Sequence, residues 1–547
     1  MPTLENPESQ ECEMALSAPI LESVARVPQR AATADPPESR AETAHAAANE
    51  ARGGEEGWGN FLQGDLVLIE GMDERDDWEL IERTVEPGMW RVRLNGTWDY
   101  AEYPADLMTL SAPVEDVDDP FAEQDDEVPS DEQITAYLDS LTDEERQELA
   151  GPLPVRWLYP WKPGEPKRAL NLFAGCGGWC AGLRRVLGCE IDMVCLDLNA
   201  DAVATSTAAG CTAVRVDVTT LDPGHWALRW THILIGSPPC TDWTLAGKRL
   251  GHLPRNIEIL LSAIVDAGEA AGNVPLTGVP GDVMTYKSPA DLSWSEVREA
   301  LGEMSTTTAG LMLEMVVFTL GLWQAGALLE TVAMEQSSAL PHEVRMALWA
   351  ELELAGWATN QWVELDAADY GSPSHRKRWF HLASNQPVDD SVNLDVPLVT
   401  LASEAIGCAP DLRVVTRGNR RTSGGNAFVM GRQIPGVTSK IRGWDVGDGG
   451  RFSLGQMALL VGMPAEHPLV GSRTSAAQQL SDVVCPAAAA AVLGVLLGLK
   501  WRPALRRYLA ELYPSAHAAE HSLVLASSME IPAQCSTAPA RDHLALF

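Results

Sequence analysis

From residue 167 onward, short apolar runs alternate with segments of helical spacing. Runs that predict strands lie at 169–173, 192–196, 214–216 and 233–235, and helical spacing falls at 178–187 and 200–209. Regular alternation of strands and helices is typical of a parallel sheet covered by helices on both faces. The pattern therefore predicts an α/β fold with a doubly wound, mostly parallel, Rossmann-like sheet, which binds ligands at the carboxyl ends of its strands.

The first 166 residues have a different pattern. Residues 1–57 are rich in Ala, Glu, Pro and Ser with few large apolar side chains, which predicts a disordered acidic tail. Short β-type runs separated by turn residues predict a small SH3-like β-barrel domain at 58–112, whose Trp and Tyr residues either pack as a core or form a binding cage. Segment 113–166 is expected to be an acidic linker with one helix, Asp131 to Leu149, entered through Ser130.

The formal net charge of −36 argues at first against a nucleic-acid partner, because phosphate contacts need Lys and Arg. The acid is concentrated in residues 1–150, which hold 38 Asp and Glu against 9 Arg and no Lys. The rest of the chain is close to balanced. Binding of DNA by that part of the chain is therefore compatible with the composition.

The ten cysteines include no C-x-x-C pair and no Cys/His cluster at zinc spacing. This predicts reduced, intracellular thiols and no structural metal. The N-terminus lacks a basic region and an apolar core, so no signal peptide is expected. The longest apolar run, 486–499, is too short and too rich in alanine to span a bilayer, so we expect a cytoplasmic protein without membrane contact.

The strand at 233–235 ends in Gly-Ser-Pro-Pro and delivers one thiol, Cys240, into a loop. Two prolines ahead of the cysteine restrict the backbone and exclude a helix, so the thiol emerges from a stiff turn. A stiff turn suits a nucleophile. A cysteine packed inside the turn is the alternative, since free cysteines are often buried.

Three other strand ends carry unusual residues. The first strand runs into a glycine loop, 173–178, where a ligand can approach the backbone and the following helix N-terminus favours an anion. The second ends at Asp197, 22 residues after Gly175, the distance at which a carboxylate accepts hydrogen bonds from ribose hydroxyls. The third ends at Asp217, suited to an adenine amine. Each Asp alone also fits a helix cap or turn, but together the three strand ends predict an adenosyl ligand.

These motifs resemble the cytosine-C5 DNA methyltransferase family. The matching blocks are 171–178, Asp197, Asp217, the Pro-Pro-Cys loop with 246–249, the Glu-bearing strand end 334–336, 370–378, 451–464 and 471–486. They follow the family's order over roughly 167–500. The resemblance implies a class I methyltransferase fold with a catalytic domain at 167–385, a target-recognition domain at 386–475, a segment at 476–500 that returns to the catalytic domain, and a C-terminal helix and tail at 501–547.

The resemblance also implies residue roles, with S-adenosylmethionine as the methyl donor, double-stranded DNA as the substrate and no metal. Cys240 would be the nucleophile, Glu335 the acid facing cytosine N3, and Arg376 and Arg378 would lie beside the flipped base. The donor would contact Phe173, Ala174, Gly175, Cys176, Gly177, Gly178, Asp197, Leu198, Asp217, Val218, Pro238, Asp482 and Val483. DNA would contact Lys248, Arg249, Arg417, Arg420, Arg421 and Arg432. The last four lie in a loop-rich basic stretch suited to phosphates and guanine edges, although any one of them also fits a solvated loop.

The sequence departs from the family pattern at several positions. Gln336 follows the glutamate where the family has Asn, Ser374 replaces a Gln before the paired arginines, and Asp482 replaces a neutral amide. Trp243, near the nucleophile, either stacks on the base or packs in the core. An insertion at about 255–304, before a helix expected at 308–323, is interpreted as a surface excursion.

The main interpretation is a DNA (cytosine-5-)-methyltransferase that acts through a covalent Cys240–C6 intermediate, as a monomer near the nucleoid of a bacterial or phage-infected cell, as in restriction-modification. The alternatives are a catalytically degenerate DNA-binding relative, or an enzyme that modifies another pyrimidine. A nicotinamide-dependent dehydrogenase shares the glycine loop but has no use for Pro-Pro-Cys or Glu335. The N-terminal β domain either recruits a protein partner, or the acidic region limits nonspecific DNA binding as a shield.

Overall fold

The computed structural model describes residues 130–244, 247–273, 292–416, 427–447 and 450–518, together with the backbone of five strands between residues 66 and 110. The tail expected at 1–57 lies outside the described residues.

The five N-terminal strands form an antiparallel sheet in the order β4-β3-β2-β1-β5. Their bounds are β1 Leu66–Ile69, β2 Trp78–Arg83, β3 Met89–Leu94, β4 Tyr100–Pro104 and β5 Met108–Leu110. The register between β2 and β3 shifts between Leu80 and Glu82, as at a β-bulge. The first four strands overlap the β-type runs at 64–69, 78–81, 89–94 and 98–103 that the sequence offers, while the SH3-like barrel and its binding cage stay predictions.

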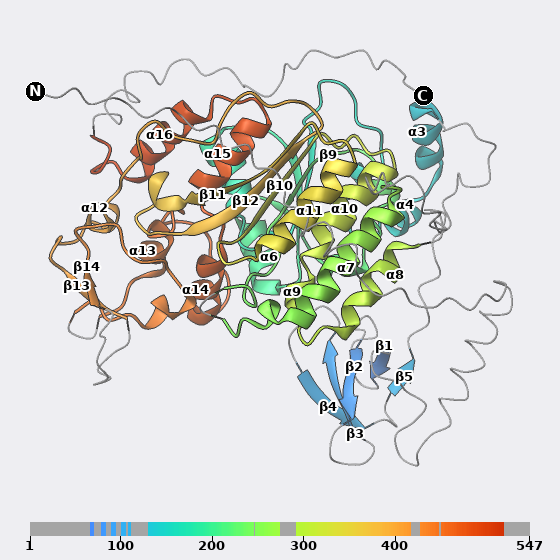
Figure 1. Cartoon of the computed structure of the whole chain (residues 1–547), viewed down its shortest axis with the longest axis horizontal. Helices are drawn as coiled ribbons and strands as arrows, with labels where there is room; N and C mark the ends of the chain where they lie inside the picture. Colours follow the sequence, from blue (N-terminus) through green and yellow to red (C-terminus); the bar gives the residue numbers. More distant parts are fainter. Residues whose placement is uncertain are drawn as a thin grey trace, which may run out of the picture. The chain divides into compact units, whose positions relative to one another are not determined.

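A seven-stranded sheet organises the rest of the chain, in the order β11-β12-β10-β9-β6-β7-β8 (Figure 1). The strands are β6 Arg168–Leu172, β7 Asp192–Asp197, β8 Thr212–Arg215, β9 Thr231–Gly236, β10 Thr331–Ser337, β11 Thr359–Asp366 and β12 Lys377–Ser384. All neighbours are parallel except at β12, which runs antiparallel to β10 and β11. The chain builds outward from β6 to β8, then returns to β9 on the other side of β6. This reversal confirms the predicted doubly wound, mostly parallel sheet.

Successive residues of the central strands face two separate cores, as the period of two requires. Leu170 and Leu172 of β6 pack with α7 (Pro254–Ala270), α10 (Leu313–Gln324) and α11 (His342–Leu354). Ala169 lies on the other face of β6 and packs with α15 (Pro486–Leu496) and α16 (Trp501–Leu512). Figure 1 shows these two helix groups on opposite sides of the strands. Because both faces are covered, β6, β9 and β10 are buried along their whole length, as expected for a parallel sheet.

The insertion expected to be a surface excursion is instead part of the first core. Pro254 begins the 17-residue helix α7, and Leu260, Ile264 and Ala267 on one of its faces are buried. The helix α8 (Trp294–Glu299) follows, capped by Ser293. The interpretation was wrong for the described parts of the insertion because the apolar spacing of α7 outweighs the flanking Pro, Gly and acidic residues. Residues 274–291 lie outside the described residues.

Two buried charged groups lie among these helices. Arg298 of α8 binds the Glu314 carboxylate of α10 through Nε and Nη2, at 2.8 to 3.2 Å, and its Nη2 also donates to the Leu221 carbonyl. Glu351 of α11 is buried, and burial raises its pKa to about 7 although Asn273 donates a hydrogen bond to it at 2.8 Å. The Arg298 guanidinium and the Glu314 carboxylate are thus paired, whereas burial of Glu351 favours the neutral form of its carboxyl.

The segment expected to be a linker with one helix contains two. They are α3 (Asp131–Ser140), capped by Ser130 as predicted, and α4 (Asp143–Ala150), which Thr142 begins with a second capping box. Leu138 lies in the first core. The one-helix prediction was wrong because Thr142 caps a new helix one residue after α3 gives way at Leu141.

A third core lies beside the glycine loop and the short helix α5 (Gly178–Ala181) that follow β6. It is formed by α12 (Ala402–Ile406), β13 (Arg413–Val415), β14 (Ala427–Val429), α13 (Leu454–Leu459) and α14 (Arg473–Asp482). At its centre Trp444 packs on Phe428 and Phe452, with ring centroids 5.5 and 6.5 Å apart. Cys176 of the glycine loop belongs to the same cluster. The segment expected to recognise DNA is therefore packed against the loop expected to bind the donor.

One helical stretch, Arg473–Leu496, is long and apolar enough to cross a membrane by length and composition alone. Within the fold, 94% of its most apolar window is buried, as in the central helix of a globular core.

Candidate active site

The loop after β6 has the backbone conformation that its glycines permit. Phe173, Gly175 and Gly177 have positive φ values of 54°, 56° and 93°, and Gly177 caps the short helix α5 (Gly178–Ala181). Among the described residues, no atom lies within 4 Å of the position that a Cβ would take on Gly175. The loop therefore leaves open space beside its backbone, which a ligand can approach.

Asp197, at the end of β7, is joined to this loop. Its carboxylate accepts hydrogen bonds from the backbone N–H of Gly175 at 2.7 Å and of Asn199 at 2.8 Å. Burial raises the pKa of Asp197, while these two hydrogen bonds lower it. The carboxylate thus fixes the loop against the next strand.

Asp217 follows β8 and begins a short 3-10 turn, Val218–Thr220. Its carboxylate accepts from the backbone N–H and the hydroxyl of Thr219, at 3.0 and 2.8 Å. The helix-cap alternative therefore holds for Asp217, and a second role toward adenine stays a prediction. Leu198 is half-buried and Val218 is buried, each directly after its strand-end aspartate.

The return segment lies directly on the glycine loop. A Cβ on Gly178 would come within 2.2 Å of the Val484 carbonyl oxygen and 2.9 Å of Val483 Cγ2. Only glycine allows this contact. Cys176 is buried with its Sγ 3.6 Å from the Gln479 carbonyl oxygen, so its side chain points into the third core.

Cys240 lies four residues beyond the end of β9, after the buried Pro238. Its carbonyl accepts from the N–H groups of Trp243 and Thr244, at 3.0 and 2.9 Å, which closes a tight turn around the thiol. Burial raises the pKa of Cys240, whereas Arg378 and Arg376 lower it and Glu335 raises it. Burial outweighs the arginines, so the thiol is mostly protonated at neutral pH.

Trp243 does not point toward a substrate. Its side chain is fully buried, packs edge to face on His252 with centroids 5.8 Å apart, and would be struck by a Cβ on Gly251. Of the two alternatives for this residue, core packing is the one that the structure favours.

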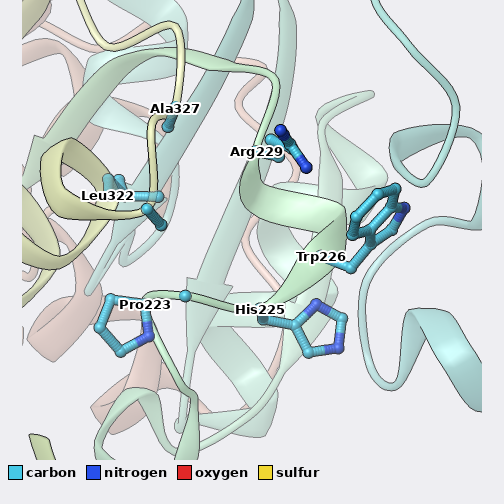
Figure 2. Close-up of a pocket in the computed structure, with 8 residues that line it drawn as sticks. Pro223, His225, Trp226, Arg229, Leu322 and Ala327 are labelled. Carbon is cyan, nitrogen blue, oxygen red and sulfur yellow. The ribbon is translucent and has the colours of Figure 1, made fainter. Parts of the chain in front are cut away.

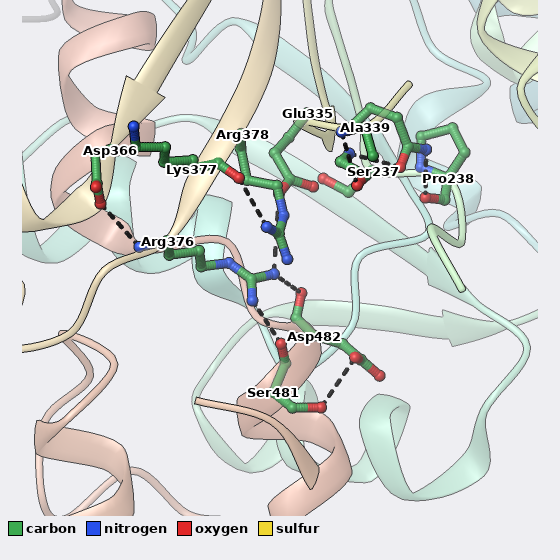
Figure 3. Close-up of polar contacts among 12 residues, drawn as sticks. Ser237, Pro238, Glu335, Ala339, Asp366, Arg376, Lys377, Arg378, Ser481 and Asp482 are labelled. Carbon is green, nitrogen blue, oxygen red and sulfur yellow. Dashed lines mark hydrogen bonds and ion pairs between the residues drawn. The ribbon is translucent and has the colours of Figure 1, made fainter. Parts of the chain in front are cut away.

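Glu335 lies on β10, beside Arg378 of β12 and Arg376, which directly precedes that strand. Its Oε1 is 2.9 Å from Arg378 Nε and 3.8 Å from Arg376 Nη2, and its side chain is 5% exposed (Figure 3). Within the described residues, Glu335 Oε1, Arg376 Nε and Arg378 Nε are buried and make no well-directed hydrogen bond. Glu335 Oε1 and Arg378 Nε nevertheless form an ion pair with each other, so the donor that this cluster offers to a polar ligand is Arg376 Nε.

Arg376 also connects the cluster to the return segment. Its guanidinium donates to the carbonyls of Ser481 at 2.6 Å and Asp482 at 3.1 Å, and its backbone N–H donates to Asp366 at 2.8 Å (Figure 3). Burial lowers its pKa. Asp366, at the end of β11, was not anticipated, although it carries the same signal as Asp197, a carboxylate directly at a strand end.

Each departure from the family pattern has a partner. Gln336 is buried and donates to the Pro238 carbonyl at 3.1 Å, which ties β10 to the cysteine loop. Ser374 donates to the Leu460 carbonyl at 2.6 Å. The exposed carboxylate of Asp482 accepts from Gln478 at 2.6 Å.

The residues expected to contact DNA are only partly described. Arg417, Arg420 and Arg421 lie outside the described residues. Lys248, Arg249 and Arg432 are exposed. Within the part of the chain that is described, no hydrogen bond or ion pair joins these three to Cys240 or Glu335, so the structure does not bring them into the cluster.

Two hollows lie away from the cysteine and the glycine loop. One, of about 210 Å³, is lined by residues that include Trp226, Arg229 and Leu322, at the amino ends of β9 and β10 (Figure 2). The other, of about 330 Å³, is lined by Glu364, Asp366, Asp369, His375 and Lys377, beside the backbone of Arg376. The first hollow therefore lies at the opposite end of β9 from Cys240.

Comparison with known proteins gives a partial match. The family model of C-5 cytosine-specific DNA methylases matches residues 168–264. The type II methyltransferase M.DdeI of Desulfomicrobium norvegicum is 34% identical over 89 residues, which are 16% of this chain and 21% of that protein. The match thus spans about a fifth of the relative's length.

Solved structures with a similar course of the chain include Entamoeba histolytica methyltransferase EhMeth and S. pombe Dnmt2 methyltransferase. EhMeth is 12% identical, with 61% of this chain and 98% of that chain covered and a TM-score of 0.38. Dnmt2 is 13% identical, with 60% and 98% covered and a TM-score of 0.38. TM-scores of this size carry no argument, so the fold is assigned from the strand order alone. The resemblance seen in the sequence is confirmed where the family model applies: residues 168–264 match the C-5 cytosine-specific DNA methylases.

Proposed function

We propose that the protein transfers a methyl group from S-adenosylmethionine to C5 of a flipped cytosine in duplex DNA. One observation carries the proposal: Cys240 follows the carboxyl end of β9, and Glu335, paired with Arg376 and Arg378, lies near the carboxyl end of the adjacent parallel strand β10. The glycine loop ends the neighbouring strand β6. A nucleophile, a carboxyl and a candidate donor site are thus combined at one edge of the sheet.

The open side of Gly175 and the carboxylate of Asp197 suit a ligand with an adenosyl group. Asp197 keeps unused acceptor capacity for ribose hydroxyls, and Asp217 and Val218 follow the adjacent strand. Val483 and Val484 close the loop from the other side. Bound there, S-adenosylmethionine would supply an electrophilic methyl group.

Cytosine C5 is a poor nucleophile, and addition of a thiolate at C6 turns it into an enamine-like carbon. Cys240 must first lose its proton, which its burial opposes and the two arginines favour. As charge moves toward N3, Glu335 is placed to share a proton with that nitrogen, and general acid help of this kind is worth about 10² to 10⁴ in rate. After methylation the C5 proton leaves and the sulfur is expelled, which regenerates the thiol.

The buried cluster of Glu335, Arg376 and Arg378 can contact a cytosine only if that base leaves the duplex. Glu335 and Arg376 have side chains that are 5% and 11% exposed, so a cytosine stacked in DNA does not reach them. Extrusion of the base costs a few kcal/mol, which contacts in the cluster would offset.

Tritium transfer from labelled S-adenosylmethionine to DNA tests the proposal. Cys240→Ser is expected to abolish transfer while S-adenosylmethionine still binds, and Cys408→Ser, at a half-buried cysteine of the third core, serves as the matched control. With duplex that contains 5-fluorocytosine the wild type should form a denaturant-resistant adduct, because fluorine cannot leave as a cation. Transfer by Cys240→Ser would refute the nucleophile assignment.

The same experiment separates the alternatives. DNA binding without transfer would favour a catalytically degenerate relative. A methylated or otherwise altered base other than 5-methylcytosine, found by mass spectrometry of nucleosides from cells that express the protein, would favour another pyrimidine.

A further inference from the structure

Three cysteines outside the candidate active site converge beneath the glycine loop. Cys180 lies on α5, Cys195 on β7 and Cys211 immediately before β8. Cys180 and Cys195 are buried, and Cys211 is half-buried. A Cβ placed on Gly177 would be 3.8 Å from Cys211 Sγ and 4.0 Å from Cys180 Cβ, so both side chains border the same point of the loop.

The three thiols and one arginine form a polar cluster. Hydrogen bonds from Cys195 and Cys211, followed by Arg184, lower the pKa of Cys180, and the pKa values of the other two thiols are raised. Arg184 is held in place by a 2.6 Å hydrogen bond to the Gly210 carbonyl, one residue before Cys211. A thiolate stabilised by thiol donors and a guanidinium is the form of cysteine that oxidants attack.

The cluster lies next to three of the segments that are proposed to hold the methyl donor. Cys180 is on the helix that follows the glycine loop, and Cys195 is two residues before Asp197. Cys211 lies in the connection between α6 (Ala200–Ala208) and β8, and Ser206 of that helix donates to the Gly175 carbonyl at 2.8 Å. A disulfide between two of these thiols would therefore shift the glycine loop.

We propose that Cys180 and Cys211 form a site of reversible oxidation by peroxide, and that the resulting disulfide weakens binding of the methyl donor. The second half of the proposal rests on the proposed function. The Cys180 thiolate attacks one peroxide oxygen, which gives a sulfenic acid and hydroxide. The Cys211 sulfur then displaces the sulfenic oxygen as water, so two thiols are oxidised and one peroxide is reduced.

The choice of Cys211 as the resolving thiol follows from the positions of the two candidates in the fold. Cys195 lies inside a strand that is paired on both sides, with β6 and β8, so its backbone is fixed. Cys211 follows the turn at Gly210 and is the more exposed thiol. Drawing Cys211 toward Cys180 moves its sulfur across Gly177 and pulls on Ser206 of α6, because the Cys211 backbone N–H donates to the Ser206 carbonyl at 3.0 Å.

The test uses the full-length protein, oxidised with hydrogen peroxide and digested without reductant. Peptide mapping should find Cys180 joined to Cys211 in the wild type and in the control Cys408→Ser. The oxidised protein should bind S-adenosylmethionine at least about tenfold more weakly, a loss of about 1.4 kcal/mol, and dithiothreitol should restore binding. Cys211→Ser should form no such bond and keep its affinity after peroxide.

Two outcomes overturn the proposal. One is that the wild type loses affinity for S-adenosylmethionine after peroxide but yields no disulfide-linked Cys180–Cys211 peptide. The other is that Cys211→Ser loses as much affinity after peroxide as the wild type does. Should a Cys180→Ser variant fail to fold, the Cys211→Ser variant and the peptide map of the wild type still test the proposal. Failure of the reduced wild type to bind S-adenosylmethionine would refute the proposed function instead, because the peptide map does not depend on that ligand.

Discussion

Replacement of Gln336 by leucine tests how the cysteine loop is held. The Gln336 side chain is fully buried, and its amide donates to the Pro238 carbonyl at 3.1 Å, two residues before Cys240. Leucine has a similar volume and fills the same space, so little cavity is created. The substitution therefore removes the donor to the buried Pro238 carbonyl and the acceptor of the Ser337 backbone N–H, at 2.7 Å, and leaves the packing nearly unchanged.

The part of the effect that reaches the cysteine loop follows from the lost bond to Pro238, since Ser337 lies on β10 itself. A buried acceptor left without its donor costs about 1–3 kcal/mol, and the loop relieves this cost by shifting away from β10. If the shift displaces Cys240 from its line of attack, the cost appears in the barrier, where each 1.36 kcal/mol is about tenfold. We expect kcat to fall by about 5- to 150-fold. Affinity for S-adenosylmethionine should change little, because the Gln336 amide does not touch the glycine loop or Asp197.

The assay is single-turnover transfer of tritium to DNA, with binding of S-adenosylmethionine measured in parallel. Gln324→Leu is the matched control, since its amide also donates to a carbonyl, that of Ala270, at 3.0 Å and at the far end of α10. The control should keep its kcat. The reasoning is refuted if Gln336→Leu turns over at the wild-type rate, or if the control loses as much.

Three further predictions concern charge. Arg378→Met removes the largest influence that lowers the pKa of Cys240, so the rate of Cys240 alkylation by iodoacetamide, followed by mass spectrometry, should reach half its maximum at higher pH than in the wild type. Arg298→Ala leaves a buried carboxylate alone and should lower the free energy of unfolding by about 3–5 kcal/mol in urea, against about 0–1 kcal/mol for the exposed ion-pair residue Arg255→Ala. The folded-state pKa of Glu351, about 7, lies above the usual 4.5, so the wild type loses stability as pH rises through this interval. Glu351→Gln should therefore be more stable than the wild type at pH 8, by up to roughly 3 kcal/mol, and equal to it near pH 4 in thermal melts.

The sheet could be predicted because its signal is local. Each central strand is a short apolar run bounded by turn residues, and the residues with unusual chemistry fall just beyond the strand ends. For the same reason the expected positions of Cys240 and Glu335, each at or beyond a strand end, agree with the structure. Strand alternation fixes the fold class because parallel strands need helical crossovers.

The insertion and the linker could not be read in this way. The face of α7 that is buried by Leu260 and Ile264 is visible in the sequence only as helical spacing, and the partner that covers it lies on α10 and α11, far along the chain. Pro, Gly and acidic residues at the ends of such a helix resemble a loop. Tertiary packing of this kind depends on contacts that no local pattern records.

The side-chain partners in the site were also beyond local reasoning. Nothing near Arg376 in the sequence indicates that its guanidinium donates to carbonyls more than 100 residues later, at Ser481 and Asp482. The thiol cluster is similar, because Cys180, Cys195 and Cys211 have no metal-like spacing and meet only through the crossovers of the sheet. Three-dimensional proximity created by topology is what sequence spacing lacks.

The departures from the family pattern bear on whether the protein turns over. A decayed active site is expected to leave replaced polar groups without partners, since no selection maintains their hydrogen bonds. Gln336, Ser374 and Asp482 instead each have a hydrogen-bond partner, and Gln336 supports the cysteine loop directly. At the centre of the cluster, Glu335 Oε1 and Arg378 Nε are joined by an ion pair of 2.9 Å. Hydrogen-bonded substitutions around an intact ion pair support the proposed methyl transfer over the alternative of a degenerate relative.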